Sequence, residues 1–230
     1  MAQNPQIEKV DMSYPSLIEL PFQTVQNTPP DEDNSDQYPQ SLVQYFLEHH
    51  TKKGAKVFDP FLGFGTTAFV AEEMGRVPYG IEADGQRFEW AAGQLEHWQN
   101  IRHGDAADAA SYGFPKMDFC ITSPPYMPCD TKWNPLYRGD PKYAGYDLYL
   151  ERLGFIFEQI ATLMKRGALV VVQADNVLGK RYTPLVRDFS AKISKHLRPE
   201  AEIIVRWSGE MPAPHKDYTH THCLVFKKKT

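Results

Sequence analysis

Segments with the pattern of strands and segments with the pattern of helices alternate along most of this chain, and this alternation limits the folds open to it. The expected strands are residues 55–61, 77–82, 101–103, 117–122 and 168–174. The expected helices are residues 39–50, 66–74, 86–98, 148–164 and 184–197. Two last strands, residues 202–207 and 222–227, follow without a helix between them. We predict a single α/β domain, Rossmann-like in layout, with a mostly parallel, doubly wound sheet and an antiparallel C-terminal edge hairpin.

The first part of the chain differs from the rest in composition. Residues 1–36 contain seven acidic side chains against one lysine and show little periodicity. We interpret residues 1–37 as an extended arm and residues 38–230 as the folded domain. The chain as a whole has a net charge of −4, but from Lys165 onward thirteen Lys or Arg residues face six acidic ones. This basic C-terminal third is compatible with phosphate contact and does not require it, since a solvated basic surface explains it equally well.

Cysteine usage and hydropathy bear on the compartment. The three cysteines, Cys120, Cys129 and Cys223, form no close pair, so we expect no disulfide framework and predict a cytoplasmic protein. No apolar run approaches the length that a bilayer requires, and residues 1–10 lack the pattern of a secretion signal. We therefore expect no membrane association.

A glycine-rich segment follows the first expected strand, with the sequence Asp59-Pro60-Phe61-Leu62-Gly63-Phe64-Gly65-Thr66-Thr67. Ligands of open α/β sheets bind outside the carboxyl ends of the strands. The glycines allow a tight turn and a close approach of the backbone to a ligand. Asp59 at the strand end can accept hydrogen bonds from a ligand ammonium, and the helix that begins at Thr66 offers free N–H groups to a carboxylate.

Two more acidic residues stand at or just after the ends of the next two expected strands, 77–82 and 101–103. Glu82 stands where an acid commonly bonds ribose hydroxyls, and Asp105, followed by Ala106, is placed to reach an adenine amino group. Each acid alone is typical of a solvated loop. Three acids after three successive strands favour a nucleotide-like ligand.

The expected strand 117–122 ends in the tetrapeptide Ser123-Pro124-Pro125-Tyr126. Together with the glycine-rich segment, this tetrapeptide resembles the DNA amino-methyltransferases, the family that methylates the exocyclic nitrogen of adenine or cytosine. The resemblance covers roughly residues 38–227 and implies a methyltransferase domain with S-adenosyl-L-methionine as cofactor. It implies the following cofactor-binding residues: Tyr38, Asp59, Pro60, Phe61, Gly63, Gly65, Thr66, Thr67, Glu82, Asp105, Ala106 and Ser123.

The tetrapeptide suits the chemistry of a base amine, whose lone pair is delocalised into the ring and is therefore a poor nucleophile. The Ser123 side chain and the Pro124 carbonyl can accept the two N–H bonds of the amine, while Pro125 fixes the backbone shape. Tyr126 offers a ring on which the target base stacks. We expect these four residues to be catalytic through positioning and electrostatics, without a dedicated base.

The sequence departs from the family pattern in two ways. Phe64 replaces the small residue, often Ser, between the loop glycines. We also expect no separate target-recognition domain, because the predicted core uses nearly everything after residue 37. Substrate contact is expected from residues 127–147, helped by the arm and residues 208–221. In the 127–147 loop we expect phosphate contacts and base stacking from Lys132, Trp133, Tyr137, Arg138 and Lys142. The alternative is a loop that folds onto the sheet and is packed by its own aromatic residues.

The sequence leaves several partners and functions open. DNA is favoured over RNA as substrate, with an RNA methyltransferase, a small-molecule methyltransferase and a cofactor-binding subunit of a larger modification complex as alternatives. A recognition partner protein is open, and the chain is expected to be a monomer or a homodimer. A metal site is not expected, because His215, His220, His222 and Cys223 match no ordinary zinc spacing.

Overall fold

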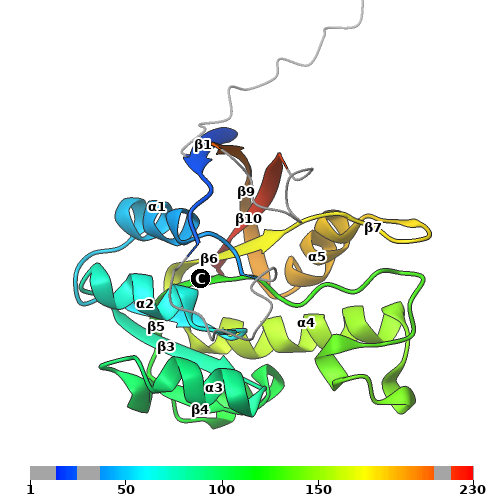
Figure 1. Ribbon diagram of the computed structural model, residues 1–230, viewed down its shortest axis with the longest axis horizontal. Coiled ribbons are helices and arrows are strands. Elements are labelled where there is room, and N and C mark those ends of the chain that lie inside the picture. The colour runs from blue at the N-terminus through cyan, green and yellow to red at the C-terminus, as the bar shows by residue number, and fades with distance from the viewer. Residues whose placement is uncertain (1–13, 25–36, 210–218, 230) are drawn as a thin grey trace, which may run out of the picture.

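The computed structural model describes residues 14–24, 37–209 and 219–229 (Figure 1). An eight-stranded sheet forms its centre, with the strand order β1-β9-β10-β6-β5-β2-β3-β4. Its strands are β1 (Leu17–Pro21), β2 (Lys56–Asp59), β3 (Val77–Glu82), β4 (Ile101–His103), β5 (Met117–Thr122), β6 (Met164–Ala174), β9 (Leu197–Ser208) and β10 (His220–Lys228). A separate two-stranded sheet pairs β7 (Val177–Leu178) with β8 (Tyr182–Thr183).

Helices cover both faces of the large sheet (Figure 1). They are α1 (Gln40–His50), α2 (Thr66–Glu73), α3 (Gly85–Ala92), α4 (Tyr146–Leu163) and α5 (Leu185–Ile193). The central strand β6 shows how the two layers form: Val170 and Val172 pack with α4 and α5, whereas Val171 packs with α1 and α2. Successive strand residues point to opposite faces, so a continuous apolar run is what a doubly covered strand requires.

The predicted fold class is confirmed. Strands β2 to β6 pair in parallel, and β10 runs antiparallel to both of its neighbours, β6 and β9. The predicted antiparallel hairpin is therefore present, but one more strand lies beyond it, because β1 pairs in parallel with β9. This part of the segment interpreted as an arm is thus built into the sheet. The sequence did not indicate β1, since its residues alternate between exposed and half-buried and form no apolar run.

The helix expected over residues 86–98 is shorter than predicted. It ends at Ala92, is followed by Gly93, and a separate short 3₁₀ turn covers Trp98–Asn100. Other 3₁₀ turns are Ala106–Ser111, Pro135–Tyr137 and Pro141–Tyr143. None of the helices in the described part of the chain has the length and apolar character needed to cross a membrane.

The fold brings the motifs predicted from the sequence to one end of the sheet. Strand β2 ends at Asp59, β3 ends at Glu82, and β5 ends at Thr122, directly before the tetrapeptide. These strands are parallel neighbours, so their carboxyl ends meet at the same edge. The glycine-rich loop and the tetrapeptide therefore lie at the same edge of the sheet.

Candidate active site

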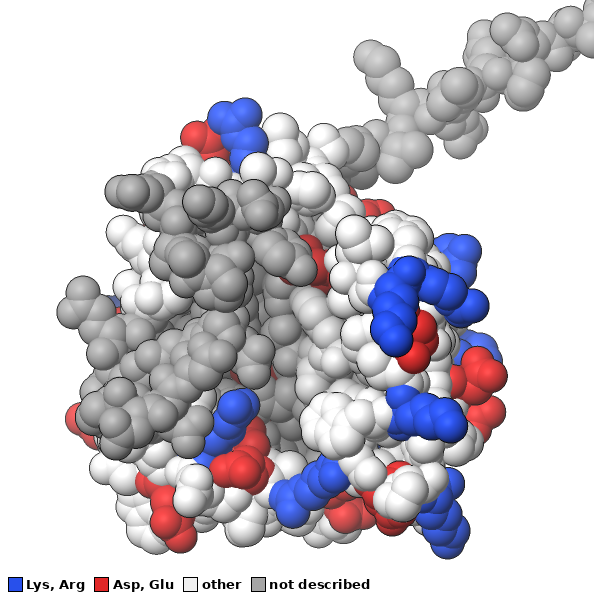
Figure 2. Space-filling view, turned by 45° about the vertical axis from the view of Figure 1, so that its right-hand side comes forward, with Lys and Arg blue, Asp and Glu red and all other residues white. Residues whose placement is uncertain are grey.

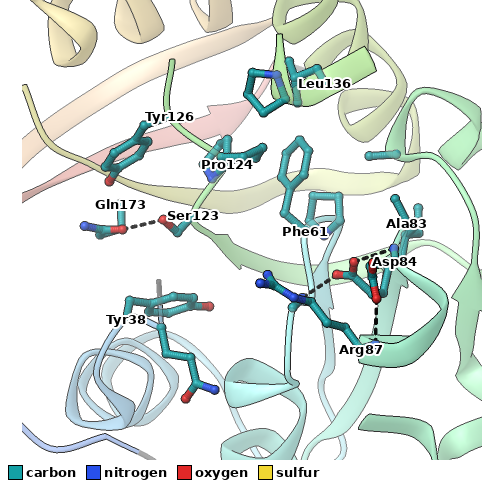
Figure 3. Close-up of a pocket in the computed structure, with 18 of the residues that line it drawn as sticks. Tyr38, Phe61, Ala83, Asp84, Arg87, Ser123, Pro124, Tyr126, Leu136 and Gln173 are labelled. Carbon is teal, nitrogen blue, oxygen red and sulfur yellow. Dashed lines mark hydrogen bonds between the residues drawn. The ribbon is translucent and has the colours of Figure 1, made fainter. Parts of the chain in front are cut away.

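A cavity of about 940 Å³ opens at this edge of the sheet (Figure 3). It is lined by residues from both predicted sets: Tyr38, Pro60, Phe61, Gly63, Glu82, Asp105 and Ala106 of the cofactor set, and Ser123, Pro124, Pro125 and Tyr126 of the tetrapeptide. Trp133 and Arg138 of the expected substrate contacts also line it. The lining leaves out several described residues that the sequence pointed to: Asp59, Gly65, Thr66, Thr67, Lys132, Tyr137 and Lys142.

Asp59 lies beneath the cavity and not in its wall. Its side chain is fully buried. One oxygen accepts hydrogen bonds from Thr122 Oγ1 at 2.6 Å and the Phe61 N–H at 3.0 Å. The other accepts from Thr67 Oγ1 at 2.6 Å and the Tyr38 hydroxyl at 3.2 Å. The carboxylate therefore ties the glycine-rich loop, α2, the segment before α1 and the end of β5 to one another.

Burial and these hydrogen bonds shift the pKa of Asp59 in opposite directions. Burial raises the pKa of its carboxyl, while the hydrogen bonds from Thr122, Thr67 and Phe61 act in the opposite direction. Burial also raises the pKa of the Tyr38 hydroxyl, which bonds Thr67 Oγ1 as well as Asp59. The interaction predicted between Asp59 and a ligand ammonium stays a prediction.

The glycine-rich loop has the conformation that its glycines allow. Gly63 and Gly65 both have positive φ angles, 58° and 96°. A Cβ atom on Gly65 would lie 3.0 Å from the ring of Phe69. Because other residues rarely adopt such angles, the loop depends on glycine at both positions. The turn exposes the Gly63 backbone to the cavity and starts α2 directly after Gly65.

Glu82 and Asp105 are placed in the cavity wall with spare acceptor capacity. Glu82 accepts one backbone N–H on each oxygen, from Gly63 at 2.6 Å and from Asp84 at 2.8 Å. Burial raises the pKa of Glu82. Asp105 accepts from the Ala107 N–H at 2.8 Å and pairs with Arg152 Nη2 at 2.6 Å. An ionised carboxylate has about four acceptor positions, so both acids can accept further bonds from a ligand.

The tetrapeptide is held from two sides. Ser123 Oγ donates to Gln173 Oε1 at 2.6 Å, a bond drawn in Figure 3. The Pro125 carbonyl accepts from the Tyr149 hydroxyl at 2.9 Å, which fixes the backbone of the motif against α4. The Tyr126 ring contacts Phe189 edge to face, with centroids 6.3 Å apart. Burial, followed by the charge of Asp175, raises the pKa of the Tyr126 hydroxyl well above its ordinary value, so this group stays neutral.

Several residues of the cavity wall were missed by the sequence analysis. The set comprises Asp84, Arg87, Gln173, Asp175 and Trp207, whereas Phe22, His220 and Thr221 lie in the two segments, the arm and residues 208–221, from which substrate contact was expected. Asp84 caps α3 through the Gln86 and Arg87 N–H groups, which is a helix-start signal that could have been read from the sequence. The Arg87 guanidinium lies 4.7 Å from the centre of the Phe64 ring, and Phe64 itself is buried. Phe64, which differs from the small residue of the family pattern, thus packs against the cationic side chain of Arg87 at the cavity rim.

The 127–147 loop agrees in part with each of the two hypotheses that the sequence left open, a surface for nucleic acid and a loop packed by its own aromatic residues. Leu136 and Asn134 are buried, and the Tyr137 ring stacks on Tyr143 at 4.1 Å between centroids. Arg152 also lies over the Tyr137 ring, at 4.6 Å. Trp133, in contrast, is 61% exposed, and Lys132, Arg138 and Lys142 are exposed as well. The loop is therefore packed through some of its aromatic residues and presents one indole and three cations to solvent.

The histidines near the C-terminus have ordinary partners where they are described. His222 Nδ1 lies 2.7 Å from Glu202 Oε1, and Cys223 is buried. His215 lies outside the described residues, as do residues 210–218 of the expected substrate segment. Within the described ranges, no group of three or more His, Cys, Asp or Glu side chains is arranged to hold a metal ion.

The glycine-rich loop and the acids that end β2 and β3 also lie in the part of the chain with a family match. Residues 9–93 match the DNA methylase family. The matched stretch includes the loop and Glu82, and it ends before the Ser123–Tyr126 tetrapeptide.

Similarity to individual proteins is local in sequence and broad in fold. The Type II methyltransferase M2.DpnII of Streptococcus pneumoniae is 38% identical over 60 residues, which are 26% of this chain and 22% of the relative. TrmN from Thermus thermophilus has a TM-score of 0.58 at 18% identity, over 83% of this chain and 49% of that one. A TehB-like SAM-dependent methyltransferase from Corynebacterium glutamicum has a TM-score of 0.54 at 14% identity, over 81% and 87% of the two chains. The fold is that of S-adenosylmethionine-dependent methyltransferases.

Proposed function

We propose that the chain is an S-adenosylmethionine-dependent methyltransferase that methylates the exocyclic amino group of adenine or cytosine in DNA. The observation that carries this proposal is the shared cavity, which joins Gly63, Glu82 and Asp105 to the Ser123–Tyr126 tetrapeptide. The match of residues 9–93 to the DNA methylase family supports it. DNA is favoured over RNA on the strength of that match.

The cavity fits S-adenosylmethionine in the hydrogen-bonding groups of its wall and in its volume. Glu82 and Asp105 offer acceptors for the ribose hydroxyls and the adenine amine. A cavity of about 940 Å³ is within the usual range for small-molecule sites and leaves room for a base beside the cofactor. Tyr38, Pro60 and Phe61 would line the methionine end, with Asp59 below them holding the loop in shape.

The residues of the tetrapeptide perform the substrate chemistry in this proposal. When bound, S-adenosylmethionine supplies a methyl group on an activated sulfonium centre. Ser123 Oγ and the Pro124 carbonyl accept the N–H bonds of the target amine and direct its lone pair. Tyr126 presents its ring to the base, which must leave the stack to reach this depth. The proton lost by the amine passes to water, so the chain needs no titrating base.

The proposed function is tested by transfer of a labelled methyl group. The protein is incubated with S-adenosylmethionine labelled in the methyl group and with separate pools of duplex DNA, single-stranded DNA and RNA. We expect label in DNA, as N6-methyladenine or N4-methylcytosine after nucleoside analysis. Label found only in RNA would replace DNA by RNA as substrate. Folded protein that binds neither S-adenosylmethionine nor its demethylated product in calorimetry would refute the proposal as a whole.

The exposed side chains of the 127–147 loop are expected to contact nucleic acid. In the Lys132→Ala/Arg138→Ala/Lys142→Ala variant, we expect the slope of log affinity against log salt to fall by about one unit per cation. Trp133→Ala is expected to weaken single-strand binding by on the order of 1–3 kcal/mol, because its indole is exposed and can stack on a base. Filter binding over a salt series measures both effects.

A matched control for this prediction is Tyr137→Ala. The Tyr137 ring is already stacked on Tyr143, so its loss should affect stability more than affinity. Cofactor affinity should be unchanged in a Lys132→Ala/Lys142→Ala variant, because these two side chains lie outside the cavity wall, whereas Arg138 lines it. Affinities and salt slopes equal to those of the wild type would place nucleic-acid recognition elsewhere, in the arm, the C-terminal segment or a partner protein.

A further inference from the structure

The Ser123 hydroxyl is held by a buried polar network that the sequence did not indicate. We infer that Gln173 is a positioning residue that fixes this hydroxyl as a hydrogen-bond acceptor for the substrate amine, an inference that rests on the proposed function. Ser123 Oγ donates its proton to Gln173 Oε1 at 2.6 Å. A hydroxyl has one proton and two lone pairs, so an Oγ atom bound in this way offers only acceptor positions to the cavity.

The orientation of the Gln173 amide is fixed by its other partners. Gln173 Nε2 donates to Asp175 Oδ2 at 2.9 Å and to Thr221 Oγ1 at 2.7 Å. Thr221 Oγ1 in turn donates to Asp175 Oδ2 at 2.9 Å. Because a carboxylate only accepts, the amide nitrogen must face Asp175, and the amide oxygen is left to face Ser123.

Burial protects the hydrogen bonds of this network from water. Gln173 is 8% exposed and Thr221 is 1% exposed, so water has little access to compete with these bonds. The network spans β6 and β10, whose antiparallel pairing places His222 opposite Ala174 and so brings Thr221 next to Gln173 and Asp175. The acceptor state of Ser123 is therefore imposed by the centre of the sheet and not by the loop that carries the tetrapeptide.

This arrangement has a consequence for substrate choice. A base amine presents N–H donors, whereas a keto group presents an acceptor at the same place. A freely rotating hydroxyl would serve either group, but a hydroxyl that has committed its proton to Gln173 pairs only with the amine. A keto oxygen would face the Ser123 lone pairs without a donor, which disfavours its binding. Gln173 thus makes Ser123 specific for amino groups.

The test is a double-mutant cycle between Ser123 and Gln173, measured as single-turnover methyl transfer to DNA. Gln173→Met keeps the side-chain volume and removes the acceptor. We expect it to lower the transfer rate about 10- to 100-fold while cofactor affinity changes less than threefold. In the Ser123→Ala background the same change should have no further effect, because the hydroxyl it positions is absent.

Two results would overturn the inference. One is a Gln173→Met rate equal to that of the wild type, and the other is an equal loss in the Ser123→Ala background. Thermal unfolding identifies a variant that fails to fold, and Gln173→Leu then replaces it in the cycle. A wild-type protein that transfers no methyl group to any base would refute the proposed function first, which distinguishes the two failures.

A second inference comes from a different surface, the β7–β8 hairpin that follows β6. We propose that its tip contacts duplex DNA beside the extruded target base, which again rests on the proposed function. Leu178 and Tyr182 are cross-strand partners and are 80% and 60% exposed. Lys180 and Arg181, between them, are exposed cations. Apolar side chains that insert between bases, flanked by cations on phosphates, are a recurrent way of holding distorted DNA.

The hairpin is fixed beside the tetrapeptide. Thr183 Oγ1 accepts the Cys129 N–H at 2.8 Å, and the Asp130 carboxylate accepts the Arg181 N–H at 2.8 Å. Asp175, directly before the hairpin, lines the cavity. Figure 2 shows Lys and Arg side chains, with Asp and Glu side chains between them, along the right-hand side of the view. A base that leaves the duplex for Ser123 would leave its gap close to the hairpin tip.

Filter binding to a mixed-sequence duplex DNA pool and to the same pool as single strands tests this second inference. Leu178→Ala/Tyr182→Ala should weaken duplex binding about 5- to 20-fold and single-strand binding less. Lys180→Ala/Arg181→Ala should reduce the salt slope by about two units. Trp98→Ala and Lys52→Ala/Lys53→Ala serve as matched controls, because these side chains are exposed outside the cavity wall. Hairpin variants that bind duplex DNA like these controls would overturn the proposal, and altered sedimentation would then assign the hairpin to self-association.

Discussion

Ser123→Ala is expected to abolish most methyl transfer while leaving cofactor affinity within a few-fold of the wild type. The hydroxyl lines the cavity and bonds Gln173, and the proposed mechanism assigns its lone pairs to the target amine. Loss of one preorganised polar partner of a reacting group typically lowers the rate about 100- to 1,000-fold. Single-turnover transfer with labelled cofactor measures the rate, and calorimetry with the demethylated cofactor measures the affinity.

Ser111→Ala is the matched control for this prediction. Ser111 is an exposed serine whose hydroxyl donates to the Asp108 carbonyl, outside the cavity wall. Its replacement should leave both measurements unchanged. If Ser123→Ala transferred methyl groups at the wild-type rate, the tetrapeptide would be only a structural turn and the proposed mechanism would be wrong.

The sequence predicted the architecture because the architecture depends on local patterns. The apolar run around Val171 indicates a strand that is buried on both faces, and Gly63 and Gly65 indicate a turn that few other residues can adopt. Parallel strands then bring Asp59, Glu82 and Ser123 to one edge without any knowledge of side-chain contacts. Local sequence patterns and the general topology of parallel sheets are therefore sufficient to predict that these three residues meet at one edge.

The polar network behind Ser123 could not be predicted in the same way. Gln173 lies in an apolar strand, and Thr221 is 48 residues further along the chain. Their contact depends on the register of β10 against β6, and a shift of one residue would turn Thr221 to the other face of the sheet. Strand register in a large sheet is a property of the packed structure, so Gln173 carried no sequence signal of its role.

The side-chain contacts in the loop between the tetrapeptide and α4 could not be predicted from the sequence either. Composition predicted rings and cations for nucleic-acid contact, but it could not separate Tyr137, stacked on Tyr143, from the exposed Trp133. The difference arises from Asn134 and Leu136, which are buried and fold the loop back onto the domain. Which ring stays exposed is decided by packing and not by composition.

Asp59→Ala is expected to destabilise the protein in the absence of any ligand. The substitution removes the acceptor of the Thr122 and Thr67 hydroxyls and of the Phe61 N–H in a buried site, while the Tyr38 hydroxyl keeps only its hydrogen bond with Thr67. Unpaired buried donors cost about 1–3 kcal/mol each before relaxation, so a loss of roughly 3–5 kcal/mol in the free energy of unfolding is expected. In a chain of this size that corresponds to a decrease in Tm on the order of 10 °C.

Glu82→Ala separates this structural role from a ligand contact. Glu82 lines the cavity and accepts one N–H per oxygen, so its loss should weaken cofactor binding with a much smaller decrease in stability. Asp59→Ala should weaken cofactor binding too, because the loop that Asp59 holds would no longer be fixed. Thermal unfolding without ligand, followed by calorimetry on the folded fraction, compares the two variants. An Asp59→Ala protein as stable as the wild type, yet deficient in cofactor binding, would show that this carboxylate acts on the ligand directly and not through Thr67, Thr122 and the loop.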